Sequence, residues 1–108
     1  MYIDLEHYIK PHIRVLSGRE EGAAIRRELN LDTHDNTDET VYIEIPSYIY
    51  SLNSSYFLSC FGNSVRKLGR EAFSKKYIFK CDLVIRKNIE DGISRAYKTS
   101  DVLEHHLV

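Results

Sequence analysis

The residues best suited to chemistry in this chain are the polar triplet Asn53-Ser54-Ser55. The triplet follows an extended run and opens residues 54–68, whose apolar spacing is typical of an amphipathic helix. The first N–H groups of a helix lack partners and lie at the positive end of its dipole, so this helix start favours an anion. A hydroxyl there can cap the helix, or it can accept a phosphate that switches a binding surface. The residues themselves leave both interpretations open.

No other group of residues predicts a catalytic or metal site. The sequence contains no Walker loop, no G-x-G-x-x-G and no nucleophile elbow. The five histidines are scattered, and the adjacent pair would not converge on one metal in a regular helix or strand; they are His7, His12, His34, His105 and His106. We therefore expect a protein that is not an enzyme and has no cofactor or metal. A small enzyme with His7 or His12 as its base is the weakest alternative.

Three tyrosines surround the helix start. Tyr48 and Tyr50 precede it and Tyr56 lies in its first turn. Aromatic residues beside a polar helix start are typical of a protein-binding surface, so we predict that these tyrosines and Asn53 contact a partner. The alternatives are half-buried tyrosines in the sheet, or tyrosines that stack on the bases of a single strand.

The charge distribution is uneven although the net charge is only −1. Residues 28–45 contain acidic side chains and no Lys or Arg, whereas residues 66–87 are basic. The basic side chains are Arg66, Lys67, Arg70, Lys75, Lys76, Lys80, Arg86 and Lys87. This asymmetry either orients a charged partner or is an ordinary solvated surface. A nucleic-acid-binding regulator that uses residues 66–87 is the alternative function, although the net charge counts against it.

Composition and length predict one cytoplasmic domain over residues 1–108. The 108 residues are 43% hydrophobic and 29% charged, as in ordinary globular proteins. Cys60 and Cys81 are too few for a disulfide framework and have the surroundings of buried apolar residues. No signal peptide and no apolar run of membrane-spanning length is recognisable, so we expect no membrane association.

The hydrophobic pattern predicts an α/β fold with a mixed sheet of about four strands and three to four helices. The predicted strands and extended segments cover residues 2–5, 12–16, 41–45, 47–52 and 77–81. The predicted helices cover residues 18–29, 54–68 and 83–97, with a short helical piece or turn at 70–75. The polar residues 30–39 are expected to form an exposed loop, and residues 98–108 a C-terminal tail.

Several residues are expected to begin or end these helices. Ser17 and Glu20 fit the capping-box pattern S-x-x-E, and Asp82 is a candidate N-cap. Gly69 is well placed to end the helix that begins at residue 54. The small residues around Gly22 would let the first helix approach a sheet closely.

The stretch Leu52–Gly69, LNSSYFLSCFGNSVRKLG, resembles the core of a STAS-like family of unknown function. That family has a pattern of the form S-S-F-L-E-E-A-F-G-G-L-V-R-x-x-G after a central strand. The matching residues are Ser54, Ser55, Phe61, Gly62, Val65, Arg66 and Gly69. With an upstream helix that also matches, the resemblance covers residues 17–97.

The family is similar to the anti-sigma-factor antagonists, in which D-S-S-G opens a helix and a GHKL-type kinase partner phosphorylates a serine. The resemblance implies a protein-interaction module without catalytic activity. Ser55 matches the phosphoacceptor and Ser54 its neighbour. Asn53 replaces the aspartate, and Tyr56 puts a bulky side chain where the pattern has glycine. Pairing of two copies through an exposed N-terminal strand is a further possibility.

Overall fold

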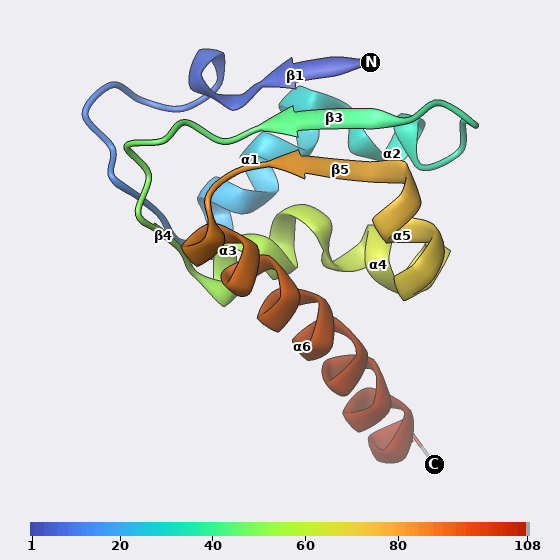
Figure 1. Cartoon of the computed structure of the whole chain (residues 1–108). Coiled ribbons are helices and arrows are strands. Elements are labelled where there is room, and N and C mark those ends of the chain that lie inside the picture. Colours follow the sequence, from blue (N-terminus) through green and yellow to red (C-terminus); the bar gives the residue numbers. More distant parts are fainter. Residues whose placement is uncertain (108) are drawn as a thin grey trace.

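The computed structural model describes residues 1–107, with the side chains of residues 1–98. Three strands form a sheet in the order β1-β3-β5: β1 (Tyr2–Asp4), β3 (Val41–Glu44) and β5 (Tyr77–Lys80). Figure 1 shows that this sheet lies along one side of the molecule and that the helices gather on one face of the sheet. Ile3 lies beside Ile43, which in turn lies beside Phe79.

A second, smaller sheet joins β2 (Val15–Leu16) to β4 (Ser51–Leu52). All strand pairs in the part of the chain that the structure describes are parallel, so the predicted mixed sheet is wrong. The reason lies in the connections, because helices separate the paired strands and return the chain to the same end of the sheet. The predicted α/β class is confirmed.

One continuous helical segment follows β4, as predicted for residues 54–68. It consists of α3 (Ser54–Phe57), a π-helical turn η2 (Leu58–Gly62) and α4 (Asn63–Leu68). Gly69 ends it with a φ of 87°, which a glycine adopts without strain. α5 (Arg70–Lys76) then leads into β5.

The remaining helices are η1, α1, α2 (Leu31–His34) and α6. A short 3₁₀ turn, η1 (Leu5–His7), follows β1, and α1 (Arg19–Leu29) agrees with the predicted first helix. α6 (Leu83–Leu107) is longer than the predicted 83–97 and includes most of the expected tail. The side chains of His105 and His106 lie outside those that the structure describes.

The two predicted helix caps have different outcomes. The Asp82 carboxylate accepts a hydrogen bond from the Ile85 N–H at 2.9 Å, which confirms Asp82 as the N-cap of α6. The capping box of Ser17 and Glu20 is wrong, since Gly18 occupies the N-cap of α1 and no side chain bonds there. Gly18 has a φ of 98°, which moves Ser17 one position outside the helix start.

The predicted exposed loop over residues 30–39 is also wrong in part. Residues Leu31–His34 form the short helix α2, and Leu31 is fully buried. Asp35 is only 5% exposed although it is acidic. A buried carboxylate needs hydrogen-bond partners, and these come from distant parts of the chain.

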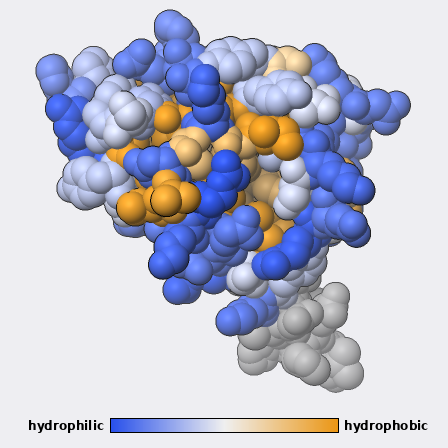
Figure 2. Space-filling model, viewed as in Figure 1, coloured by the Kyte–Doolittle hydropathy of each residue, from blue (hydrophilic) through white to orange (hydrophobic). Residues whose placement is uncertain are grey.

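The helices cover one face of the larger sheet and leave the other face open. An aromatic cluster fills the covered side; it consists of Phe57, Phe61, Phe73, Tyr77 and Phe79. On the open face Tyr2, Tyr42 and Ile78 lie side by side across the three strands and are exposed. Figure 2 shows further apolar surface near the start of α6, where Leu83 is exposed.

Two glycines allow helices to approach one another closely. A Cβ on Gly22 of α1 would lie 2.1 Å from the Ser59 Oγ and 2.4 Å from the Tyr56 carbonyl oxygen. Gly22 of α1 therefore faces the helical segment 54–68, not the sheet that we expected. On α6, a Cβ on Gly92 would lie 2.3 Å from the Phe57 ring.

We expect Gly92→Ala to destabilise the protein by about 1–3 kcal/mol, because the added methyl group overlaps a packed aromatic ring. A change from glycine to alanine inside a helix normally stabilises it by up to about 1 kcal/mol, so the expected sign is reversed. Asp91→Ala, at the neighbouring exposed position, is the control. Urea unfolding measures both, and a Gly92→Ala variant as stable as the parent would contradict the close packing.

Candidate functional site

Ser55 lines a polar hollow that runs along one side of the helical segment 54–68. The hollow has a volume of about 300 Å³ and is lined by Arg19, Ser55, Leu58, Ser59, Asn63 and Arg66. Ser55 itself is exposed. Arginines from two helices, α1 and α4, thus share one hollow with the predicted phosphoacceptor.

The interpretation of the triplet as a helix cap is not supported by any side-chain hydrogen bond at this helix start. Asn53 occupies the N-cap position with extended backbone, and its side chain makes no capping bond. Its carbonyl oxygen instead accepts the Phe57 N–H at 3.0 Å. Among the described side chains, no hydrogen bond holds the hydroxyl of Ser54 or Ser55, and Ser54 is half-buried. The Ser55 hydroxyl is therefore free to react or to bind.

The arginines of the hollow differ in how they are held. Arg66 donates to the Asn63 side-chain oxygen at 2.7 Å and more weakly to the Ala96 carbonyl at 3.4 Å. Arg19 is exposed at the first position of α1. An anion in the hollow would meet two guanidinium groups, that of Arg66, which hydrogen bonds hold in place, and that of the exposed Arg19.

The structure separates the predicted partner-binding tyrosines. Tyr50 is 64% exposed, whereas Tyr56 is only 3% exposed, so the prediction that Tyr56 contacts a partner is wrong. Tyr56 lines a different cavity, against α1, and its bulk does not cover Ser55. Tyr48 is half-buried: its hydroxyl donates to Glu6 at 3.2 Å, and the Arg14 guanidinium lies 5.2 Å from the centre of its ring.

Sequence reasoning missed a buried polar network beside this site. Arg26 donates to the Asp35 carboxylate at 3.0 Å and to the Ser64 hydroxyl at 2.9 Å. Ser64 and Tyr77 both donate to the same carboxylate. Arg26 also donates to the Cys60 carbonyl at 2.7 Å, within the π-helical turn. The network thereby joins α1, the segment after α2, the helical segment 54–68 and β5.

Burial and the neighbouring carboxylates shift the pKa of Arg26 in opposite directions, whereas burial and Asp35 shift the pKa of Tyr77 in the same direction. Burial lowers the pKa of Arg26, but hydrogen bonds and attraction from Asp32 and Asp35 outweigh it and raise that pKa above its usual value. Burial, and then the hydrogen bond to Asp35, raise the pKa of Tyr77. The guanidinium therefore stays charged and the phenol stays neutral at physiological pH.

One signal in the sequence could have revealed the network. Arg26 lies on the same side of α1 as Gly22 and Leu29, which are both buried. A guanidinium at the edge of a buried stripe requires a carboxylate, and the acidic residues after this helix supply one. Which acid serves cannot be deduced from spacing.

The basic segment 66–87 largely makes contacts within the chain. Lys67 donates to Asn36 at 2.6 Å, and Lys76 donates to the carbonyls of Thr37 and Glu39 at 2.6 and 2.7 Å. Further internal hydrogen bonds hold Arg66, Arg70 and Arg86. Nothing in this arrangement favours the nucleic-acid alternative.

Among side chains that the structure describes, no group of three or more His, Cys, Asp or Glu is arranged to hold a metal ion. None of the described helices has both the length and the apolar character to cross a membrane. Comparisons with protein-family models, with curated proteins and with solved structures found nothing that matches this chain.

We expect Asp35→Ala to destabilise the protein by about 3–5 kcal/mol, because the Arg26 charge would lose its buried partner. Asp32 also pairs with Arg26, at 2.7 Å, but its side chain is 86% exposed. Asp32→Ala is therefore the matched control, with an expected cost of about 0–1 kcal/mol. Equal costs in urea unfolding would show that burial does not distinguish the two carboxylates.

The two cysteines should differ in reactivity. Burial raises the pKa of the Cys60 thiol to about 12, and the Arg26 charge only partly opposes this. Burial also raises the pKa of Cys81, which is half-buried. We expect a thiol reagent at pH 8 to modify Cys81 first, and Cys60 only when the protein unfolds. Labelling followed by peptide mass spectrometry measures the order.

The Cys60 thiol also adds a pH dependence with a defined sign. Its pKa in the folded protein is above the unfolded value near 9, so its contribution is fully present below about pH 9. That contribution is lost as the pH rises toward about 12. Cys60→Ala should flatten this part of the stability curve, and an unchanged slope would argue against a buried neutral thiol.

Proposed function

We propose that this chain is a STAS-like regulatory module without catalytic activity, which binds a protein partner through the surface around Ser55. In this proposal a GHKL-type ATPase partner phosphorylates Ser55 and thereby ends the complex. The observation that carries it is the exposed Ser55 hydroxyl, free of hydrogen bonds among the described side chains, beside a hollow lined by Arg19 and Arg66. The resemblance of Leu52–Gly69 to the STAS-like pattern supports the same assignment.

A phosphate on Ser55 would be compatible with the domain itself. It would bring about −1.5 to −2 charges and three acceptor oxygens to a helix start. The N–H groups of that helix start and the guanidinium groups of Arg19 and Arg66 favour this charge. Phosphorylation can therefore leave the fold unchanged while it adds negative charge to the surface at Ser55.

The partner's surface would not accept the same charge. Before modification, Ser55 and the neighbouring Asn53 are exposed and uncharged, and the guanidinium groups of Arg19 and Arg66 line the hollow beside them. A partner that packs against this surface would have to desolvate the phosphate or face it with like charge. A loss of about 3 kcal/mol would lower the affinity more than a hundredfold.

Ser55 is a better candidate than Ser54 on grounds of access. Ser55 is exposed and lines the hollow, whereas Ser54 is half-buried and does not. A kinase has to position the hydroxyl against the γ-phosphate, so exposure is required. We assign the phosphoacceptor role to Ser55 and leave Ser54 as its neighbour.

We expect Ser55→Asp to weaken partner binding at least tenfold while the Tm changes by no more than about 2 °C. The partner is first recovered from the native host with the tagged full chain, identified by mass spectrometry, and then purified for titration. Ser47→Asp, at an exposed position in the loop before β4, is the control for added charge.

Ser55→Ala separates phosphorylation from helix structure. This variant should bind the partner as the parent does, but addition of ATP should no longer release it. An unfolded Ser55→Asp variant would show that Ser55 is structural. Release of Ser55→Ala by ATP would exclude Ser55 as the phosphoacceptor, and recovery of nucleic acid instead of a protein would favour the other functional class.

A further inference from the structure

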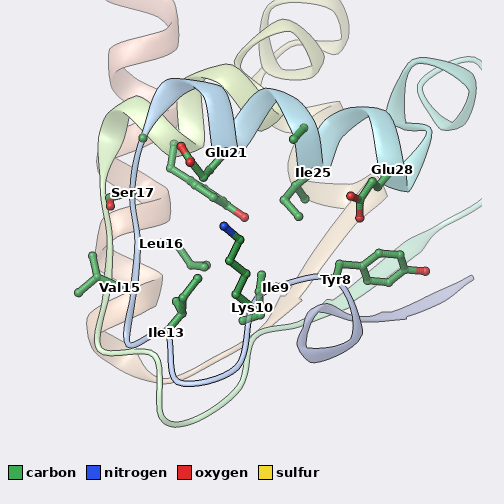
Figure 3. A pocket seen from close by; sticks show the side chains of 13 residues that line it. Tyr8, Ile9, Lys10, Ile13, Val15, Leu16, Ser17, Glu21, Ile25 and Glu28 are labelled. Carbon is green, nitrogen blue, oxygen red and sulfur yellow. The ribbon is translucent and has the colours of Figure 1, made fainter.

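A second cavity lies between α1 and the segment that connects η1 to α1. Its volume is about 480 Å³, within the range of small-molecule sites. Figure 3 shows Ile13, Leu16 and Ile25 directed into this space from both walls. None of the residues that line the hollow beside Ser55 lines this cavity, so the two are separate sites.

A buried hydroxyl without a partner lies in the wall of this cavity. Tyr56 lines it and is only 3% exposed, and its Oη atom has no hydrogen-bond partner. Folded proteins rarely leave a buried donor without a partner, so this hydroxyl is available to a hydrogen-bond acceptor from outside the chain. Burial raises the pKa of this phenol, as do nearby Cys60, Glu21 and Glu28, so the O–H remains a donor.

The charges around the cavity restrict what can enter it. The Lys10 ammonium and the carboxylates of Glu21 and Glu28 line it, so negative charge exceeds positive. An anionic ligand would face two carboxylates, and an ammonium ligand would offer no acceptor to the Tyr56 O–H. A neutral molecule with an acceptor oxygen meets both conditions.

We propose that this cavity binds a small neutral amphipathic molecule with a carbonyl oxygen. Its apolar body would pack against Ile13, Leu16 and Ile25, and its carbonyl oxygen would accept the hydrogen bond of the Tyr56 hydroxyl. The proposal does not depend on phosphorylation of Ser55 or on a protein partner, and binding of a small molecule in this cavity tests it directly.

The test uses the full-length chain and three probes that share an apolar chain but differ in charge: 2-octanone, octanoate and octylamine. Backbone amide resonances are followed by NMR during each titration. We expect 2-octanone to shift the amides of residues 8–28 in a saturable manner. The charged probes should bind at least tenfold more weakly. Saturable binding of 2-octanone elsewhere, equal binding of either charged probe, or no binding of any probe would overturn the proposal.

Tyr56→Phe tests the hydrogen bond. The variant should bind 2-octanone about five- to tenfold more weakly than the parent, as expected for the loss of one hydrogen bond. Its folded state should be at least as stable, because the hydroxyl that it removes has no partner in the free protein. Tyr48→Phe removes a hydroxyl outside the cavity and should leave binding unchanged. Equal affinity of Tyr56→Phe and the parent would overturn the proposed contact.

Ala24→Phe tests the cavity itself. Ala24 lines the cavity from α1 and is half-buried, so a phenyl group there would occupy the space that a ligand needs. Binding of 2-octanone should be lost while the amide spectrum stays that of a folded protein. If a folded Ala24→Phe variant binds as the parent does, the ligand does not occupy this cavity.

Discussion

The ion pair of Arg26 with the buried carboxylate of Asp35 is the interaction on which the rest of the structure depends. Two charges removed from water are tolerated only if every remaining hydrogen-bonding group finds a partner. The hydroxyl groups of Ser64 and Tyr77 donate further hydrogen bonds to the Asp35 carboxylate. The Cys60 carbonyl and the Asp32 carboxylate accept the remaining hydrogen bonds of the Arg26 guanidinium. Arg26, Asp35 and these partners come from four separate parts of the chain: α1, residues 31–35, the helical segment 54–68 and β5. The network therefore holds those parts in one arrangement.

That arrangement places α1 directly against the helical segment 54–68. Gly22 leaves space for the Ser59 side chain and the Tyr56 carbonyl, and Arg26, one turn further along α1, binds the carbonyl of Cys60. The π-helical turn lies at this contact. Both cavities border the same contact, one on each side, and successive residues belong to different ones: Ser55 lines the polar hollow and Tyr56 the apolar cavity.

The parallel sheet adds a further constraint. Parallel sheets usually have both faces covered, but here the helices cover one face only. Tyr2, Tyr42 and Ile78 lie exposed on the open face. The hollow beside Ser55 is lined by residues of α1 and of the helical segment 54–68, so no strand of this sheet contributes to it.

The sequence alone determined the order and type of most elements. Strong local patterns account for this: alternating β-branched residues predicted β3, and regular apolar spacing predicted α1, the segment 54–68 and α6. Asp82 and Gly69 act through neighbours in the sequence, so their roles were also predictable. The polar triplet was found for the same reason, since a helix start is a local feature.

Only the tertiary structure decided which residues share a site. Arg19 and Arg66 meet beside Ser55 because α1 packs on the segment 54–68, and no local pattern specifies that contact. Asp35 was predicted to be exposed because acidic residues usually are, and its burial depends on Arg26, Ser64 and Tyr77. Tyr56 was predicted to face a partner, whereas helix packing turned it inward. Sequence patterns record local preferences, while burial and charge pairing depend on segments that meet only in the folded chain.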